Sequence, residues 1–121
     1  MVKLCHASLG ATHADSLAIL IEPMSSDDVK IESLMKSANQ LRETDMTSAL
    51  KFYNQALQLA QKTTNYKKIA ELNLIFGSMF FYSGNYDRVL TYYYEALKNY
   101  VIIQDTSGFV AAFFNIALVY N

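Results

Sequence analysis

The sequence is poor in the residues that cross-link a chain or break its helices. Its 121 residues include one Cys, one Pro, four Gly and no Trp. A single cysteine excludes an internal disulfide framework, and so few Gly and Pro residues disfavour a protein of short strands and turns. No apolar run reaches about eighteen residues, so we expect no membrane insertion. The fold must therefore depend on the packing of helices.

Charge is also scarce and nearly balanced. Ten Lys and Arg stand against eleven Asp and Glu, which gives a net charge of −1. A nucleic-acid-binding protein needs a basic face, so nucleic acid is excluded as a partner. With 52% hydrophobic and 17% charged residues the chain is expected to be ordered. Its length suits one domain.

Aromatic and charged residues are unevenly distributed along the chain. All nine Tyr and all seven Phe lie at or after Phe52. Residues 89–121 contain only three charged side chains, Glu95, Lys98 and Asp105. A monomer exposing this region would present a large apolar patch, and such patches usually mark an interface.

Apolar periodicity predicts helices throughout residues 15–121. A short helix over 15–22 should end before Pro23, because a residue that precedes proline leaves the α region. Later helices are expected from an amino terminus at Asp27-Asp28 through the apolar stripe of residues 31–41, after the cap residue Asp45, from 66 to 83, from 86 to 104, and from about 109 onward. Gly84 supplies a left-handed stop.

Residues 1–14 form a leader with two open interpretations. They could be a tag-like extension or the remnant of a secretory signal, although His6 and His13 make the apolar part too polar for a typical signal. We expect a soluble protein, cytoplasmic or, if the leader is a signal remnant, periplasmic. The sequence does not decide the compartment.

An internal repeat of forty residues runs through the helical region. Tyr53 is followed by Tyr93, Ala56-Leu57 by Ala96-Leu97, and Gly77 by Ala117. The units predicted are about 28–64, 66–105 and a half repeat over 106–121. A two-helix unit of this length cannot bury its apolar stripe alone, so neighbouring units are expected to stack.

Residues 76–97, FGSMFFYSGNYDRVLTYYYEAL, resemble the tetratricopeptide (TPR) repeat. The residues that fit its pattern of small and aromatic positions are Gly77, Phe80, Gly84, Tyr86, Tyr93 and Ala96, with Val89 replacing the usual Ala. Ser37, Ala49, Tyr53 and Ala56 match in the earlier unit, where Gln40 replaces an aromatic, and Ala117 and Tyr120 match in the half repeat. Forty-residue versions resemble the amino-terminal regions of certain bacterial sensor kinases and regulators.

The resemblance implies an all-α fold, a right-handed superhelix of antiparallel helical hairpins. It also implies a partner-binding groove on the first helix of each unit. The groove positions carried over are Leu34, Ala38, Leu41, Arg42, Glu71, Leu74, Ser78, Phe81, Tyr82, Ala111, Phe114 and Leu118. Most are apolar, which suits an apolar helix or peptide and disfavours the acidic tails that some family members bind. For Phe81 and Tyr82, binding and helix packing are equally good interpretations; for Leu74 and Leu118 we favour packing.

No pattern of catalytic or cofactor-binding residues stands out. The four glycines are too dispersed for a phosphate loop, and no paired cysteines or His-Glu-x-x-His motif frames a zinc site. Cys5, His6 and His13 cluster only in the leader. Asp27-Asp28 and Glu43 with Asp45 fall at predicted helix ends, where capping explains them. We therefore expect no enzyme, no metal and no cofactor.

The run Tyr92-Tyr93-Tyr94 could suggest a stacking platform for single-stranded nucleic acid. Consecutive helical residues point about 100° apart, so three neighbours cannot form one flat surface. We predict that Tyr93 is a core residue and that Tyr92 and Tyr94 flank it.

Three functional hypotheses follow. The first is a non-catalytic protein or peptide interaction module, a piece of a larger bacterial signalling protein, because the last helix is apolar around most of its circumference and has no following partner helix. The second is a self-assembling unit that homodimerises through Phe109, Phe113, Phe114, Ile116 and Tyr120. The third is a module that regulates a catalytic domain elsewhere in a longer protein.

Overall fold

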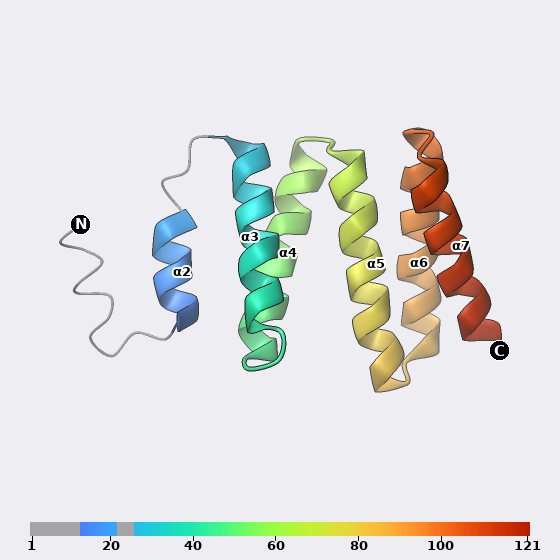
Figure 1. Ribbon diagram of the computed structural model, residues 1–121, viewed down its shortest axis with the longest axis horizontal. Helices are drawn as coiled ribbons and strands as arrows, with labels where there is room; N and C mark the ends of the chain where they lie inside the picture. Colours follow the sequence, from blue (N-terminus) through green and yellow to red (C-terminus); the bar gives the residue numbers. More distant parts are fainter. Residues whose placement is uncertain (1–12, 22–25) are drawn as a thin grey trace. The chain divides into compact units, whose positions relative to one another are not determined.

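The computed structural model describes residues 13–21 and 26–121, and within them every regular element is a helix. The helices are α2 (His13–Ile21), α3 (Asp27–Leu41), α4 (Met46–Lys62), α5 (Tyr66–Ser83), α6 (Tyr86–Ile102) and α7 (Thr106–Tyr120) (Figure 1). The all-α prediction is confirmed. Most of the predicted leader, with Cys5 and His6, lies outside the described residues, and so does Pro23.

The helices form two compact units, Met1–Leu59 and Ala60–Asn121, which divide within α4. These are packing units of the helices, and the single repeat domain expected over 15–121 stays a prediction. Each unit draws its contacts chiefly from helices that are neighbours in sequence, a pattern typical of helical repeats.

In the first unit, α2 packs against α3, and α3 and α4 each bury an apolar stripe. The buried residues of these two helices include Ile31, Leu34, Met35, Ala38, Leu41, Ala49, Phe52, Tyr53 and Ala56. The Tyr53 hydroxyl donates a hydrogen bond to the Asn39 side-chain carbonyl, which joins α4 to α3. Burial raises the pKa of Tyr53, and the nearby Arg42 guanidinium opposes that shift. The phenol therefore stays neutral, as a buried hydrogen-bond donor must.

In the second unit, α5, α6 and α7 run antiparallel in turn, α5 joining α6 at one end and α6 joining α7 at the other (Figure 1). One core cluster contains Ala70, Ala96, Tyr100 and Ala112, and the other contains Val89, Tyr93 and Ile116. Leu74 and Leu97 pack against both clusters. Helix α6 thus contributes to both of these clusters.

The turns before α5, α6 and α7 have the same geometry. Each has a residue in the left-handed region, with φ of 51° at Thr64, 82° at Gly84 and 56° at Gln104. The following residue, Asn65, Asn85 or Asp105, donates its backbone N–H to a carbonyl five residues earlier, over 2.9, 3.3 and 3.0 Å. These are Schellman-type helix ends that recur every twenty residues. The turn between α3 and α4 differs, because Asp45 donates to Leu41 over 2.7 Å, four residues back.

At three of the four positions 45, 65, 85 and 105, which are twenty residues apart, a side chain caps the following helix. The carboxylate or carboxamide oxygens of Asp45, Asn65 and Asp105 accept the backbone N–H three residues later, over 3.1, 3.2 and 2.9 Å. Asn85 makes no such side-chain bond. At Asp45, hydrogen bonds from Ser48 hold the carboxyl pKa below its ordinary value. Each capped helix start thereby gains an acceptor for one of its exposed N–H groups.

Two glycines make room for tyrosine rings between helices of the second unit. A Cβ at Gly77 would overlap the ring of Tyr93, and a Cβ at Gly108 would overlap the ring of Tyr100. Both tyrosines come from α6, so one ring lies on α5 and the other on α7. The absence of a side chain at these two positions sets how closely α6 packs on both neighbours.

The helix boundaries lie within about three residues of the sequence predictions. Helix α5 has the predicted bounds, whereas α6 ends at Ile102 instead of residue 104, because Gln104 adopts the left-handed conformation. Helix α7 begins at Thr106, three residues earlier than predicted, because Asp105 caps it. Helix α2 begins at His13 and ends at Ile21, where 15–22 was predicted.

Candidate functional site

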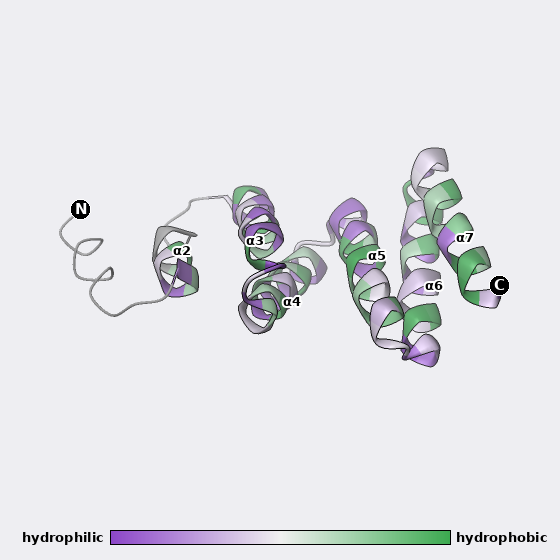
Figure 2. Cartoon of the chain, turned by 60° about the horizontal axis from the view of Figure 1, so that its bottom comes forward, coloured by the Kyte–Doolittle hydropathy of each residue, from purple (hydrophilic) through white to green (hydrophobic). Residues whose placement is uncertain are grey.

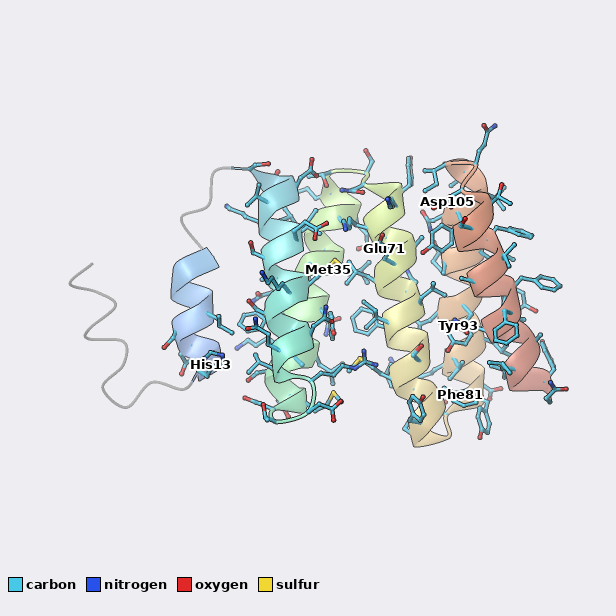
Figure 3. The ribbon with its side chains drawn as sticks, in the orientation of Figure 1. His13, Met35, Glu71, Phe81, Tyr93 and Asp105 are labelled. Carbon is cyan, nitrogen blue, oxygen red and sulfur yellow. The ribbon has the colours of Figure 1, made fainter. Side chains whose placement is uncertain are left out.

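The candidate site is a small cleft in the second unit, formed by α5, α6 and α7. Its volume is about 120 Å³, and its lining comprises Ser78, Phe81 and Tyr82 from α5, Tyr93 from α6, and Asn115 and Leu118 from α7. Figure 3 shows Tyr93 on α6, between its two neighbours, and Phe81 near the end of α5 that leads into α6. The cleft combines apolar walls with a few hydroxyl and amide groups.

Tyr93 forms the deepest part of the cleft. Its side chain is buried in a core cluster with Val89 and Ile116. Its hydroxyl lies 3.3 Å from the Ser78 hydroxyl, close enough for a hydrogen bond in which either group donates. Gly77 makes this position possible, because any side chain there would collide with the ring. A buried tyrosine whose hydroxyl contacts Ser78 therefore lines the cleft.

Aromatic side chains form one wall. Phe81 makes edge-to-face contacts with Tyr82, at 5.9 Å between ring centroids, and with Tyr86, at 5.7 Å. Tyr82 itself is 86% exposed. An exposed tyrosine held beside a fixed phenylalanine supplies contact area with few rotatable bonds, which favours binding.

Exposed apolar residues continue from the cleft along α7. Val110, Phe113, Phe114, Leu118 and Tyr120 are all exposed, and the helix contains no Asp, Glu, Lys or Arg. Figure 2 shows hydrophobic residues along most of α7. Phe109 and Phe113 stack at 6.2 Å. The apolar surface predicted for the last third of the chain is thus concentrated on this helix.

A second aromatic group packs α5 against α6. Tyr92 stacks between Phe76 and Phe80, each at 5.5 Å, and the Arg88 guanidinium lies 4.4 Å above the Phe80 ring. Tyr93 is buried, Tyr92 half-buried and Tyr94 exposed. The prediction that Tyr93 is a core residue is confirmed, and the three tyrosines point in different directions.

The groove residues predicted in the first unit have little surface to offer a partner. Leu34, Ala38 and Leu41 are buried, so they belong to the core and do not line an open groove, and Arg42 is half-buried beside Tyr53. Their spacing marked an apolar stripe, and periodicity alone does not distinguish a buried stripe from an accessible one.

The groove residues predicted in the second unit lie partly at the cleft. Ser78, Phe81, Tyr82 and Leu118 line it, whereas Asn115 and Tyr93 were not predicted. Leu74 packs in the core as favoured, but Leu118 is 45% exposed. Ala111 and Phe114 are exposed outside the cleft lining. Glu71 forms an ion pair with Lys68 at 3.1 Å.

The predicted oligomer interface needs one correction. Ile116 is only 7% exposed and packs with Val89 and Tyr93, so it is a core residue. Phe109, Phe113, Phe114 and Tyr120 are exposed. The error arose because α7 is apolar on several sides, so the sequence does not show which apolar side packs against α6.

The acidic residues that the sequence placed at helix ends do lie at helix starts. Asp27 and Asp28 lie in the first turn of α3, where their negative charges interact favourably with the helix dipole. Asp45 caps α4. Among the described residues no group of three or more His, Cys, Asp or Glu side chains could hold a metal ion. His13 lies exposed at the start of α2.

Within the described residues no helix is long and apolar enough to cross a bilayer. Comparisons with protein-family models, with curated proteins and with solved structures found no match.

Proposed function

We propose that this chain is a non-catalytic module that binds a protein or peptide, and that its binding surface combines the α5–α7 cleft with the exposed side chains of α7. The observation that carries the proposal is the gathering of exposed apolar residues on an uncharged helix beside a preformed cleft. Apolar surface of this kind is costly in water and is typically covered by a partner.

The TPR-like repeat agrees with this proposal. Antiparallel helices with the same turn every twenty residues, and with tyrosine rings against glycine, are what stacked helical hairpins require. We extend the proposal to a role as a scaffold or sensing segment in a bacterial signalling protein, on the resemblance of residues 76–97. In that setting the module would bring another protein to an effector.

Selection from a random-peptide phage library tests the binding function. Peptides enriched on the wild-type protein should lose affinity by about tenfold or more when Tyr82→Ser and Leu118→Ser are combined, because both side chains line the cleft. The control is Val101→Ser, which alters an exposed apolar residue of α6 away from this cleft. Equal affinity for all three proteins would contradict the proposal.

Homodimerisation through α7 is the second candidate function. It rests on the exposure of Phe113 and Phe114, 59% and 61%, on a helix without charge that could repel a second copy. Light scattering across a concentration series tests it. The double variant Phe113→Glu, Phe114→Glu should be a folded monomer if the wild type is a dimer, and an unchanged mass would reject this interface.

A further inference from the structure

The hairpins α3–α4 and α5–α6 are related by two different offsets in sequence. Asp45 donates its backbone N–H to the carbonyl of Leu41, four residues back, whereas Asn85 donates to Phe80, five residues back. The turn of the first hairpin is therefore one residue shorter. Positions after the turn match at an offset of 40, as Asp45 and Asn85 do, and positions before it match at 39, as Leu41 and Phe80 do.

Burial supports the offset of 39 between α3 and α5. Ile31 and its counterpart Ala70 are both 0% exposed. Ala38 is also fully buried, and its counterpart Gly77 is buried. An offset of 40 would instead match Ala38 with Ser78, which is half-buried. The two hairpins can therefore be compared position by position.

Each hairpin buries one tyrosine at the same place on its second helix, Tyr53 on α4 and Tyr93 on α6. In the first hairpin the Tyr53 hydroxyl has two partners. It donates a hydrogen bond to the Asn39 side-chain carbonyl, and the Arg42 guanidinium hydrogen-bonds the same hydroxyl. The protein's own carboxamide and guanidinium thus satisfy this buried phenol.

The second hairpin lacks both of these partners. At an offset of 39, Ser78 stands for Asn39 and Phe81 stands for Arg42. Ser78 is shorter, so its hydroxyl lies 3.3 Å from that of Tyr93, compared with about 2.7–2.8 Å for a typical bond between hydroxyls. Among the described residues, this is the only hydrogen-bonding contact of the Tyr93 hydroxyl. The cleft of about 120 Å³ borders these residues, at the place where the first hairpin has its carboxamide.

The other polar group of the cleft is the carboxamide of Asn115, which is half-buried. It makes no hydrogen bond with the described part of the chain. No charged side chain lines the cleft, so a charged ligand group would lose its hydration without gaining a counter-charge. A primary carboxamide is neutral and has both an acceptor and two donors, which matches hydroxyl and amide groups on the cleft walls.

We infer that the cleft binds a side-chain carboxamide, from a Gln or Asn of the partner, in the place that Asn39 occupies in the first hairpin. Because this inference rests on the proposed binding function, the partner is a protein or peptide that inserts one such side chain. Its carboxamide oxygen accepts a hydrogen bond from the Tyr93 hydroxyl, and its NH₂ group donates to the Asn115 side-chain oxygen. The aliphatic part of the inserted side chain packs against Phe81 and Tyr82, which line the same cleft.

N-acetylglutamine methylamide is the probe, and NMR of the isotopically labelled protein reports where it binds. At millimolar concentrations it should shift the signals of the Ser78 backbone amide and the Asn115 side-chain amide. N-acetylglutamate methylamide has the same shape with a charge, and N-acetylmethionine methylamide lacks the hydrogen-bonding groups. Both should bind about tenfold or more weakly than the glutamine derivative.

Two variants and a control locate the carboxamide. Tyr93→Phe keeps the ring but removes the hydroxyl, so it should abolish the preference for the glutamine derivative over the methionine derivative. Ser78→Asn should block the probe, because it places a carboxamide of the protein beside Tyr93, as in the first hairpin. Ser83→Asn is the matched control, since it makes the same change at an exposed position of α5 outside the cleft lining. If Ser78→Asn does not fold, Tyr93→Phe decides alone.

Equal binding of the three derivatives would show that the cleft recognises the peptide backbone or apolar surface, and would overturn the inference. A preference for glutamine that persists in Tyr93→Phe would overturn it too, and so would the absence of any shift at the cleft residues.

The carboxamide site and the proposed function fail separately. Selected peptides that depend on Tyr82 and Leu118, without a preference for the glutamine derivative, would retain the binding function and reject the carboxamide site. A preference for the glutamine derivative, without any selected peptide, would retain the carboxamide site and reject the binding of a protein or peptide.

Discussion

Helices α5 and α7 are the same structural element in two surroundings. Both start at a capped Asx residue after a left-handed residue, and both bury positions 72 and 76 or their counterparts 112 and 116. Yet α5 has α6 against the side of Ala70 and Gly77, whereas Val110 and Ala117 on α7 are open to solvent. The comparison teaches that residue type follows the repeat, while burial follows the neighbouring helix.

The largest effect is expected where α7 is buried. Ile116→Ala should lower the free energy of unfolding by about 2–5 kcal/mol, because it leaves a cavity beside Val89 and Tyr93. Phe113→Ala removes a larger side chain but should change stability by about 0.5 kcal/mol or less, because Phe113 is exposed. Denaturant unfolding followed by circular dichroism measures both. Equal losses would show that Phe113 also belongs to the core.

A smaller difference is expected between Gly77 and Ala117. Gly77→Leu should destabilise the protein by about 1–3 kcal/mol, because the new side chain would force Tyr93 away from α5. Ala117→Leu, forty residues on, should be close to neutral, since it points into solvent. Thermal unfolding of the two variants is the measurement. A Gly77→Leu protein that melts with the wild type would disprove the close contact.

The caps provide a third comparison. Asp105→Ala should cost about 0.5–2 kcal/mol, because its carboxylate accepts the Gly108 N–H over 2.9 Å at the start of α7. Asn85→Ala should cost less, since Asn85 makes no side-chain bond to the first turn of α6. Urea titration of both variants gives the two values. A larger loss of stability in Asn85→Ala than in Asp105→Ala would contradict the conclusion that Asp105 caps its helix and Asn85 does not.

The smallest effect is expected on the pH dependence of stability, through Tyr100, whose ring lies against Gly108. Burial, followed by the nearby carboxylates of Glu71 and Asp105, raises the pKa of Tyr100, while Lys68 opposes the shift. A raised folded-state pKa contributes stability below the unfolded-state value of about 10. That contribution is lost as the pH rises through the folded-state pKa. Tyr100→Phe should therefore lose stability less steeply above about pH 10 than the wild type; equal slopes would contradict the prediction.

The helices of the second unit could be predicted well because their ends carry strong local signals. Gly84 after Ser83 stops α5 at the predicted residue, and Tyr93 was placed correctly in the core from its position on the apolar stripe of α6. Asp105 caps α7 and moves its start to Thr106, three residues before the predicted start. Local chemistry at a turn is contained in a few consecutive residues, so a sequence can reveal it.

The candidate site was predicted less completely because it depends on which helices meet. Ser78, Phe81, Tyr82 and Leu118 were named from the TPR resemblance, and they do line one cleft. Asn115 was missed because it stands alone among apolar residues, and Tyr93 because a core residue can also form the floor of a cleft. Leu34, Ala38 and Leu41 have the same pattern but are buried. Sequence periodicity identifies an apolar side, and only the neighbouring elements decide whether it is covered.

The repeated turn between neighbouring helices also has a kinetic consequence. In the second unit α6 contacts α5 and α7, each joined to it by a short turn, so most contacts link residues close in sequence. Contacts of this kind require little loop closure, and helical proteins built from them fold within about microseconds to milliseconds. The α5–α6 hairpin can form its own Gly77–Tyr93 contact before α7 is added. During synthesis, the contacts between α5 and α6 can therefore form early, while full burial of their apolar stripes waits for the neighbouring helices.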